Sequence, residues 1–403
     1  MTCLRNIALT LIFFALTVPL AVSGNQDTTE VNLAEVEVTG ETIKDAEQSG
    51  EPGGKAKKEA KDPNRGRFLP IPIFITEPAI GEGLGLALAY FHRAKDTPEE
   101  TAIASPGSIG STTREQAPPP TVTGVFGAYT SSETAAFGAG HMNTFKDDHI
   151  RFTAVAGYAD VNSTFYILDQ PFKFNLEGLL AYQETRFRFG DSRWFWGIGL
   201  SYLDATNVFE VDIPDDAPIE LFGTELRNTG ISAKLAWDTL DNTSMPNRGQ
   251  LFDLSVWRYD ESFSGDYNYW DARLKVLSFH QLNDNFVLGL RLEYLTIDGR
   301  APFFAVPWVS LRGIPALRYQ GDRVAVAEIE ARYNLSPRWA VIGFAGSGAV
   351  ASDIPALDTE QSIYAYGLGG RYNIFQSQNI WVGIDIAKGP EERAWYIQVG
   401  HAW

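Results

Sequence analysis

The chain has 403 residues, of which 44% are apolar and 13% are aromatic, and this composition excludes a disordered polar tail. Fifty acidic residues against 33 basic ones give a formal net charge of −17. Nucleic-acid binders gather Lys and Arg against phosphates, so this charge argues against a nucleic-acid partner.

Residues 1–24 have the pattern of a cleavable secretory signal. An apolar run, IALTLIFFALTVPLAV, follows Arg5 and is itself followed by small residues at 21–24. The only cysteine, Cys3, lies before this run, so cleavage near residue 24 leaves a chain without a thiol. We therefore expect neither a disulfide nor a thiolate metal site in the exported protein.

Residues 25–67 are polar and charged and contain no aromatic side chain. We predict that they form a flexible periplasmic linker. No stretch of 18 or more uninterrupted apolar residues follows the signal, so a membrane-spanning helix is not predicted. The exported chain is then either soluble or a β-barrel, the other structure that can span a membrane.

Residues 68–403 consist of segments of about ten residues in which apolar and polar side chains alternate, the pattern of β-strands. In FVLGLRLEYL, residues 286–295, the even positions are apolar, whereas the odd ones include Arg291 and Glu293. One face suits lipid and the other suits a polar lumen. A soluble antiparallel sandwich alternates in the same way, so alternation alone leaves both architectures open.

Connection lengths favour the barrel, because short turns and long loops alternate from residue 227 onward, as in outer-membrane proteins. We predict an all-β fold, a transmembrane antiparallel β-barrel of about sixteen strands over 68–403, with fourteen strands as the alternative. The strands are expected near 83–93, 119–129, 133–143, 148–158, 164–169, 176–190, 193–206, 227–238, 250–259, 267–280, 285–296, 323–335, 338–350, 362–375, 379–387 and 394–403.

The last predicted strand, AWYIQVGHAW, stops on an aromatic residue. Outer-membrane barrels commonly end in this way, and the assembly machinery reads the final aromatic side chain. We therefore interpret Gly400 and Trp403 as part of a closing strand and an assembly signal. Together with the export signal, this predicts location in the outer membrane of a Gram-negative bacterium.

Three segments resemble one family, the BamA/TamA-type bacterial surface antigen superfamily of outer-membrane assembly and secretion barrels. DTLDNTSMPNRGQLFDLSV resembles its turn between two middle strands, and VSLRGIPALRYQGD resembles its long external loop that folds back into the lumen. AYGLGGRYNIFQSQNIWVGIDIAKGPEERAWYIQVGHAW is similar to its last three strands. The matching positions are Asp238, Asp241, Asn242, Pro246 and Gly249 in the turn, Arg312 and Gly313 in the loop, and Gly367, Gly369, Gly370, Arg371 and Asp385 in the last strands.

The Arg312–Gly313 pair is the predicted tip of the lumen loop. A guanidinium offers a planar fork of donors, so Arg312 can lock onto acidic lumen residues, and Gly313 lets the backbone turn closely. Glu328 and Glu330 are the predicted acceptors, because their parity places them on the inner face of the next strand. The resemblance implies a lumen aspartate where this sequence has Gly346, so Glu330 is expected to carry more of the lock.

The resemblance implies a role in inserting or translocating protein or lipid at the outer membrane, with no enzymatic chemistry and no cofactor. Its implied partners are outer-membrane lipids, the outer-membrane assembly machinery and a periplasmic or secreted protein. No polypeptide-binding domain fits into residues 25–66, so we expect a reduced, barrel-only member. A soft seam is expected where 81–90 meets 394–403. A passive pore or structural barrel remains the alternative.

An enzyme is not predicted. The five histidines, at positions 92, 141, 149, 280 and 401, show no recognisable pairing with a nucleophile. The sequence has no GxSxG, no HExxH and no Gly-rich phosphate loop with a lysine. Catalytic, cofactor-binding and metal-binding residues are therefore all predicted to be absent.

Overall fold

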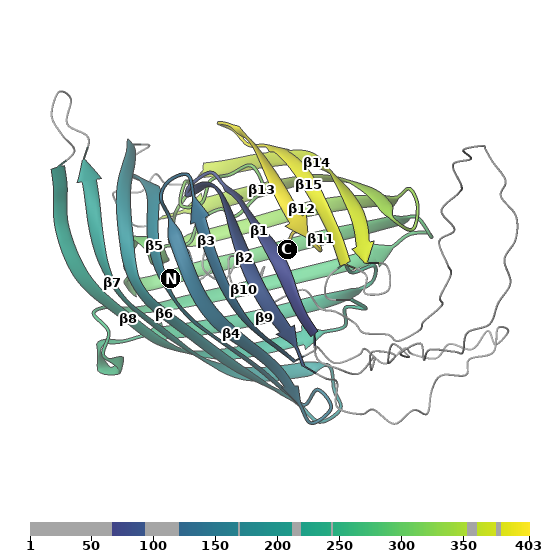
Figure 1. Cartoon of the computed structure of the whole chain (residues 1–403), viewed down its shortest axis with the longest axis horizontal. Coiled ribbons are helices and arrows are strands. Elements are labelled where there is room, and N and C mark those ends of the chain that lie inside the picture. Colours follow the sequence, from purple (N-terminus) through teal and green to yellow (C-terminus); the bar gives the residue numbers. More distant parts are fainter. Residues whose placement is uncertain are drawn as a thin grey trace, which may run out of the picture.

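A computed structural model describes residues 67–92, 121–167, 170–211, 219–242, 245–352, 361–375 and 380–403. The described residues are almost entirely β-structure (Figure 1), interrupted by two short 3-10 helices, η1 (Glu261–Phe263) and η2 (Phe303–Ala305). The strands are β1 (Arg67–Glu77), β2 (Gly81–Phe91), β3 (Val122–Thr130), β4 (Ala135–Phe145), β5 (Ile150–Ile167), β6 (Gln170–Arg188), β7 (Trp194–Val211), β8 (Ile219–Asp238), β9 (Gly249–Tyr259), β10 (Asn268–Gln281), β11 (Phe286–Arg300), β12 (Arg323–Asn334), β13 (Trp339–Ala351), β14 (Gln361–Phe375), β15 (Ile380–Lys388) and β16 (Arg393–Val399).

The strands form one sheet of sixteen, in sequence order from β1 to β16, and each pairs antiparallel with the next. The sheet curves around until β1 and β16 face each other, which gives a nearly closed barrel (Figure 1). This confirms the predicted fold class and the strand number. No helix within the described ranges is long and apolar enough to cross a membrane.

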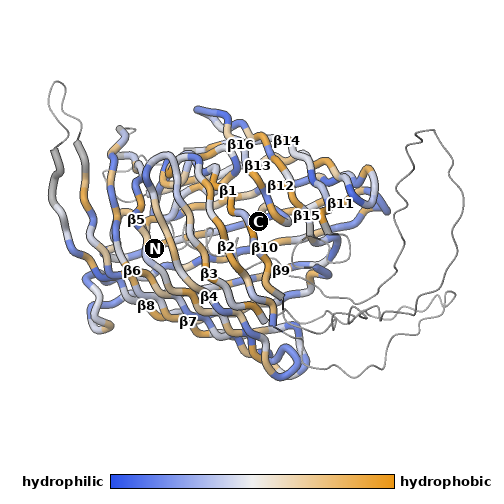
Figure 2. The backbone as a smooth tube through the Cα atoms, in the orientation of Figure 1, coloured by the Kyte–Doolittle hydropathy of each residue, from blue (hydrophilic) through white to orange (hydrophobic). Residues whose placement is uncertain are grey.

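The predicted alternation is also confirmed, and Figure 2 shows the bands of opposite hydropathy along the strands. In β11, Leu292 and Tyr294 point outward and are 55% and 45% exposed, whereas Arg291 and Glu293 point inward and are buried. Exposed apolar side chains recur on the outer face of nearly every strand. An apolar outer surface around a charged interior is the pattern of a barrel that spans a lipid bilayer.

Two errors in the strand prediction cancelled in the count. The first strand is β1, residues 67–77, which was not predicted, and the two strands expected near 148–158 and 164–169 are the single strand β5. β1 contains Pro70 and Pro72, which cannot donate to a ladder and are tolerated on an edge strand. β5 escaped recognition because its 18 residues exceed the roughly ten needed to cross a bilayer.

Strands β5 to β8 are unusually long, with 18, 19, 18 and 20 residues, so they project beyond the membrane at one end. The inner face of this projection is aromatic, and the ring of Phe165 lies 4.6 Å from that of Phe303 in the loop after β11. Phe174 contacts the same loop ring at 4.9 Å. The projecting part of strands β5 to β8 therefore packs against the lumen loop.

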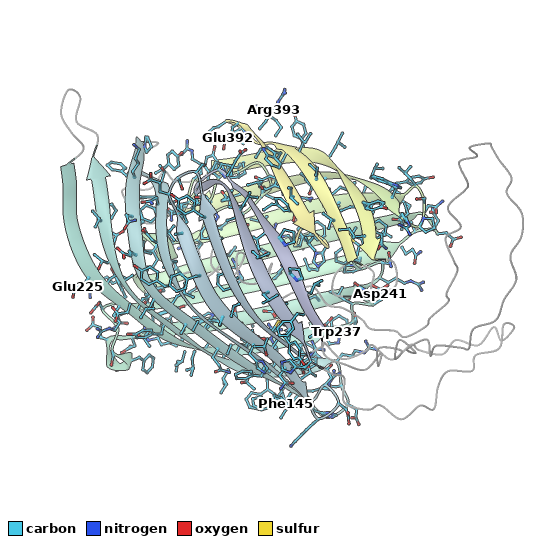
Figure 3. All side chains as sticks on the ribbon, in the orientation of Figure 1. Phe145, Glu225, Trp237, Asp241, Glu392 and Arg393 are labelled. Atoms are coloured by element: carbon cyan, nitrogen blue, oxygen red, sulfur yellow. The ribbon has the colours of Figure 1, made fainter. Side chains whose placement is uncertain are left out.

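The four-residue turns at 146–149, 282–285 and 335–338 lie at one end of the barrel, and the long loop between β11 and β12 lies at the other end. Phe145, Trp237 and Asp241, all near the end with the four-residue turns, lie on one side of the view in Figure 3, and Glu225 lies on the opposite side.

Candidate functional site in the barrel lumen

The loop between β11 and β12, residues 301–322, lies inside the barrel. Phe304, Val309, Leu311 and Leu317 are buried, and a β-bridge between Trp308 and Gln320 holds the two arms of the loop together. The loop packs against the inner faces of the surrounding strands and forms two apolar clusters with them. A long loop folded into the lumen is thus what the structure shows.

Gly313 forms the tip of this loop, and a glycine is required there for two reasons. Its φ of +93° lies in the left-handed region, which side chains disfavour. A Cβ atom at this position would also lie 2.9 Å from the backbone nitrogen of Gly389 and 3.2 Å from Ala387. The tip therefore fits closely against the β15–β16 hairpin.

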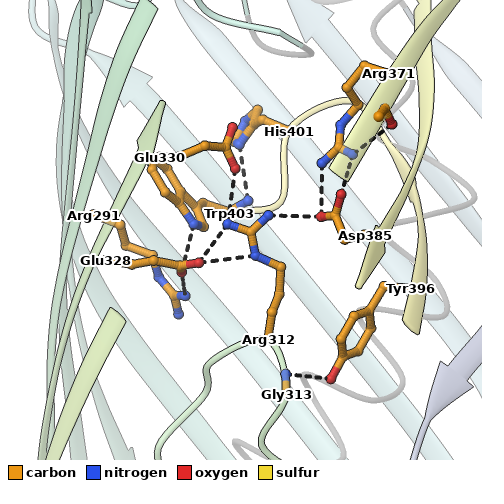
Figure 4. Close-up of polar contacts among 11 residues, drawn as sticks. Arg291, Arg312, Gly313, Glu328, Glu330, Arg371, Asp385, Tyr396, His401 and Trp403 are labelled. Carbon is orange, nitrogen blue, oxygen red and sulfur yellow. Dashed lines mark hydrogen bonds and ion pairs between the residues drawn. The ribbon is translucent and has the colours of Figure 1, made fainter. Parts of the chain in front are cut away.

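Arg312, the residue before the tip, is buried and binds three carboxylates from two strands (Figure 4). Its Nη2 lies 2.6 Å from Glu328 Oε1 and 3.0 Å from Glu330 Oε2. Its Nη1 lies 2.8 Å from Asp385 Oδ2. The guanidinium also stacks on Phe344, with its carbon 3.4 Å from the ring centroid.

The local sequence explains why these acids meet. Glu328 and Glu330 are two residues apart on β12, so both side chains point into the lumen. Asp385 is an isolated acid between apolar residues of β15, and its register partner on β14 is Gly369. A Cβ at Gly369 would lie 2.0 Å from the Asp385 carboxylate, so the glycine makes room for it.

The structure adds one acceptor that the sequence prediction missed. Asp385 was matched to the family but was not assigned to Arg312, although its inward parity within an apolar strand was a usable signal. It also binds Arg371, whose Nη2 lies 3.0 Å away. At the predicted departure, a Cβ on Gly346 would lie 2.6 Å from Leu311, so this position holds the loop rather than an acid.

The charge of Arg312 is stabilised where it lies. Burial lowers the pKa of its guanidinium, but the carboxylates of Glu328, Glu330 and Asp385 outweigh this and hold the pKa above its ordinary value. Arg291 of β11 binds the second oxygen of Glu328 at 3.1 Å, which extends the network along the wall. Removal of a buried arginine that has several charged partners is strongly destabilising, because it leaves buried carboxylates unpaired.

The predicted family turn lies between β8 and β9, where its polar residues organise the backbone. Asp241 Oδ1 accepts hydrogen bonds from the backbone N–H groups of Asn247 at 2.9 Å and Arg248 at 3.2 Å. Asn242 caps Met245 N–H at 2.8 Å, and Asp238 caps Leu240 N–H at 3.1 Å. The remaining predicted residues are Pro246, whose carbonyl accepts from Arg332, and Gly249, which has a φ of +106°.

This turn does more than reverse the chain, because its apolar side chains pack against residues of the strands. Met245 is buried against Ala340 and Trp381, and Leu240 packs in the cluster of Leu277 and Phe279.

The predicted closing strand ends early. β16 stops at Val399, Gly400 has a φ of +82°, and the chain turns inward. The Trp403 indole N–H donates to Glu328 Oε2 at 2.8 Å (Figure 4). The Trp403 ring lies 5.6 Å from that of Phe279. Trp403 therefore lies in the lumen beside the Arg312 network, not in the barrel wall.

The seam lies between β1 and β16, not between 81–90 and the last strand as predicted, because β1 precedes that segment. The two seam strands approach each other, but within the described ranges no β-ladder pairing connects β1 to β16. β16 has seven residues and is the shortest of the described strands. A cavity of about 270 Å³ lies behind the seam, lined by β1, the loop and β16.

Three histidines make side-chain contacts that the sequence did not predict. Ser278 Oγ and His280 Nε2 lie 2.8 Å apart on the outer face of β10, but no carboxylate orients the imidazole among its described contacts. His92 and His141 both bind the Thr123 hydroxyl, at 2.7 and 2.8 Å. The parts of the chain that the structure describes contain no cluster of three metal-ligating side chains.

Neither a protein-family model nor a curated protein matches the chain. Solved structures do match it. BamA from Haemophilus ducreyi lacking POTRA domains 1–3 has a TM-score of 0.54 at 11% identity and covers 84% of this chain and 71% of its own. CdiB from Escherichia coli gives 0.54 at 13% identity over 83% of this chain and 62% of its own, and CdiB from Acinetobacter baumannii gives 0.51 at 11% over 83% and 59%.

The chain has the fold of the BamA and CdiB barrels. This confirms the predicted resemblance at the level of architecture. The chain spans less than two thirds of the length of either CdiB protein.

Proposed function

We propose that this chain is a BamA/TamA-type barrel of the Gram-negative outer membrane that helps to insert or translocate protein or lipid without covalent chemistry. The observation that carries the proposal is the combination of a lumen closed by the Arg312 loop with a seam that lacks strand pairing. When a loop occupies the lumen and the first and last strands do not pair, the barrel is suited to opening sideways, between β1 and β16.

The physical cost of this arrangement supports a functional reason for it. Unpaired backbone N–H and C=O groups at membrane depth are costly, because lipid tails cannot hydrogen-bond them. A passive barrel avoids that cost by pairing every strand. The edges of β1 and β16 are therefore available to a polar occupant, such as the backbone of a polypeptide. Outer-membrane lipids, assembly factors and a periplasmic or secreted protein are its proposed partners.

Site-specific photocrosslinking in intact cells tests this proposal. The crosslinker is placed at Phe74, which is 40% exposed on β1, and in a control protein at Val125, which is 55% exposed on β3. Capture of nascent outer-membrane or secreted polypeptides at Phe74, but not at Val125, supports a polypeptide role. Capture of lipid carriers would indicate that the barrel handles lipid and not polypeptide.

Equal capture at the two positions, together with steady solute leakage through the purified barrel, would overturn the proposal and favour the passive pore. The lumen loop argues against that alternative, because buried loop residues lie inside the barrel that solute would have to cross.

A further inference from the structure

The lumen loop contacts both strands of the seam, although these strands do not pair with each other. The backbone N–H of Ala316 donates to the Glu77 carboxylate of β1 at 2.9 Å. The backbone N–H of Gly313 donates to the Tyr396 hydroxyl of β16 at 2.8 Å (Figure 4). Two loop residues three positions apart thus bind the two opposite edges of the gap.

We propose that residues 313–316 are a strap that holds the seam shut, and that Glu77 and Tyr396 are the positioning residues to which it attaches. The consequence for transport rests on the function proposed above, whereas the strap itself is a statement about the barrel alone. The strap regulates opening because release of either attachment frees one edge of the wall.

The strap is anchored at its N-terminal end and can therefore hold the strands of the seam together. Arg312, directly before it, is bound to carboxylates of β12 and β15. Gly313 packs against Gly389 so closely that a Cβ would lie 2.9 Å from the Gly389 nitrogen. Strand β1, by contrast, is paired on one side only, with β2. Within the described residues, Glu77 is thus the point at which the loop holds the free edge.

A direct contact also crosses the seam, and it must be separated from the strap. The Trp395 indole N–H donates to Glu82 at 3.0 Å on the outer surface. Trp395 is 43% exposed, whereas the backbone donors of the two strap contacts, Gly313 and Ala316, are buried and their acceptors are half-buried. The strap contacts are thus better shielded than the outer contact, so we expect them to contribute more to closure.

The cavity behind the seam gives a way to observe opening. It is lined by Ile73 of β1, Ile314 of the strap and Ile397 of β16. Ile73 is only 2% exposed, so a cysteine there reacts slowly with a maleimide while the seam is shut. Ala205, buried at 6% on the inner face of β7, gives a matched reporter away from the seam. Cys3 is replaced by Ser in all proteins.

Reporter labelling is compared in the full-length protein in liposomes, using only preparations that show folded, heat-modifiable migration. We expect Glu77→Ala and Tyr396→Phe each to accelerate labelling at Ile73→Cys about tenfold, and the double variant to accelerate it further. Glu77→Gln keeps an acceptor oxygen for the Ala316 N–H and should leave the rate near that of the parent. Labelling at Ala205→Cys should not change.

Several results would overturn the strap. An unchanged rate at Ile73→Cys in the double variant would show that the seam is held by other contacts. Equal acceleration at both reporters would indicate general loosening. A larger effect from Trp395→Phe than from Tyr396→Phe would assign closure to the outer contact.

The same variants separate the strap from the proposed function. Faster labelling at Ile73→Cys with unchanged crosslinking at Phe74 in cells would leave the strap standing and count against transport through the seam. Changed crosslinking with unchanged labelling would do the reverse.

Discussion

Trp403 and Arg312 bind the two oxygens of one carboxylate. The indole N–H of Trp403 donates to Glu328 Oε2 at 2.8 Å, and Arg312 donates to Glu328 Oε1 at 2.6 Å. The last residue of the chain and the tip of the lumen loop are therefore connected through a single side chain of β12. Displacement of one alters the charge environment of the other, so the loop and the strand end that borders the seam should respond together.

Arg312→Ala should release the lumen loop. Breaking a buried ion pair costs about 3–5 kcal/mol, because the partner charges remain buried and unpaired. We expect a large drop in the temperature at which folded, heat-modifiable migration is lost. Arg300→Ala is the control, since its contact with Glu261 is between side chains that are 71% and 59% exposed. If the two variants lost stability equally, the buried lock would be excluded.

Arg312 and Glu330 should also fail to act independently. Their atoms lie 3.0 Å apart, so the cost of Arg312→Ala plus Glu330→Ala should differ from the cost of the double variant by about 1–3 kcal/mol. In a control cycle, Arg312→Ala is combined with Glu184→Ala, because Glu184 binds Lys234 on another part of the wall. The costs of these two substitutions should add. Calorimetry of the four proteins of each cycle gives the coupling. Additivity in both cycles contradicts the predicted contact.

Gly313→Ala should destabilise the loop tip by about 1–3 kcal/mol, because its φ of +93° is strained for alanine. The added Cβ would also press on the β15–β16 hairpin. Gly370→Ala on β14 has open space around the new Cβ and should cost little. Thermal unfolding of both variants measures the difference. A tolerated Gly313→Ala would mean that the tip is not held where the structure places it.

The barrel itself was predictable from local pattern, since period-two alternation directly marks which side chains face lipid and which face the lumen. The acceptors Glu328 and Glu330 followed from the same parity. Asp385 was harder, because it meets Arg312 across 73 residues of sequence, and no local rule states which strand curves against which loop.

Backbone geometry set the other limits of prediction. β1 was missed because Pro70 and Pro72 break the expected strand chemistry, and only the open seam explains why they are tolerated. The inward turn of Trp403 depends on the positive φ of Gly400, which the letters GHAW do not reveal. From the sequence alone, the terminal Trp403 fits a closing strand as well as it fits an inward turn.

Deleting Trp403 should lower barrel assembly more than deleting residues 25–60. The reason is the lumen contact: the deletion removes the indole donor to Glu328 and leaves space beside Gly289, where a Cβ would lie 2.9 Å from the Trp403 ring. Trp403→Phe keeps an aromatic ring and loses only the N–H donor, so it should assemble better than the deletion but unfold at a lower temperature than the parent. Pulse-labelled assembly in cells, scored by heat-modifiable migration, measures all three proteins. If the Trp403 deletion assembled as well as the parent, the seat beside Glu328 would contribute nothing to closing the barrel, and the connection between the chain end and the loop would be a consequence of folding and not one of its causes.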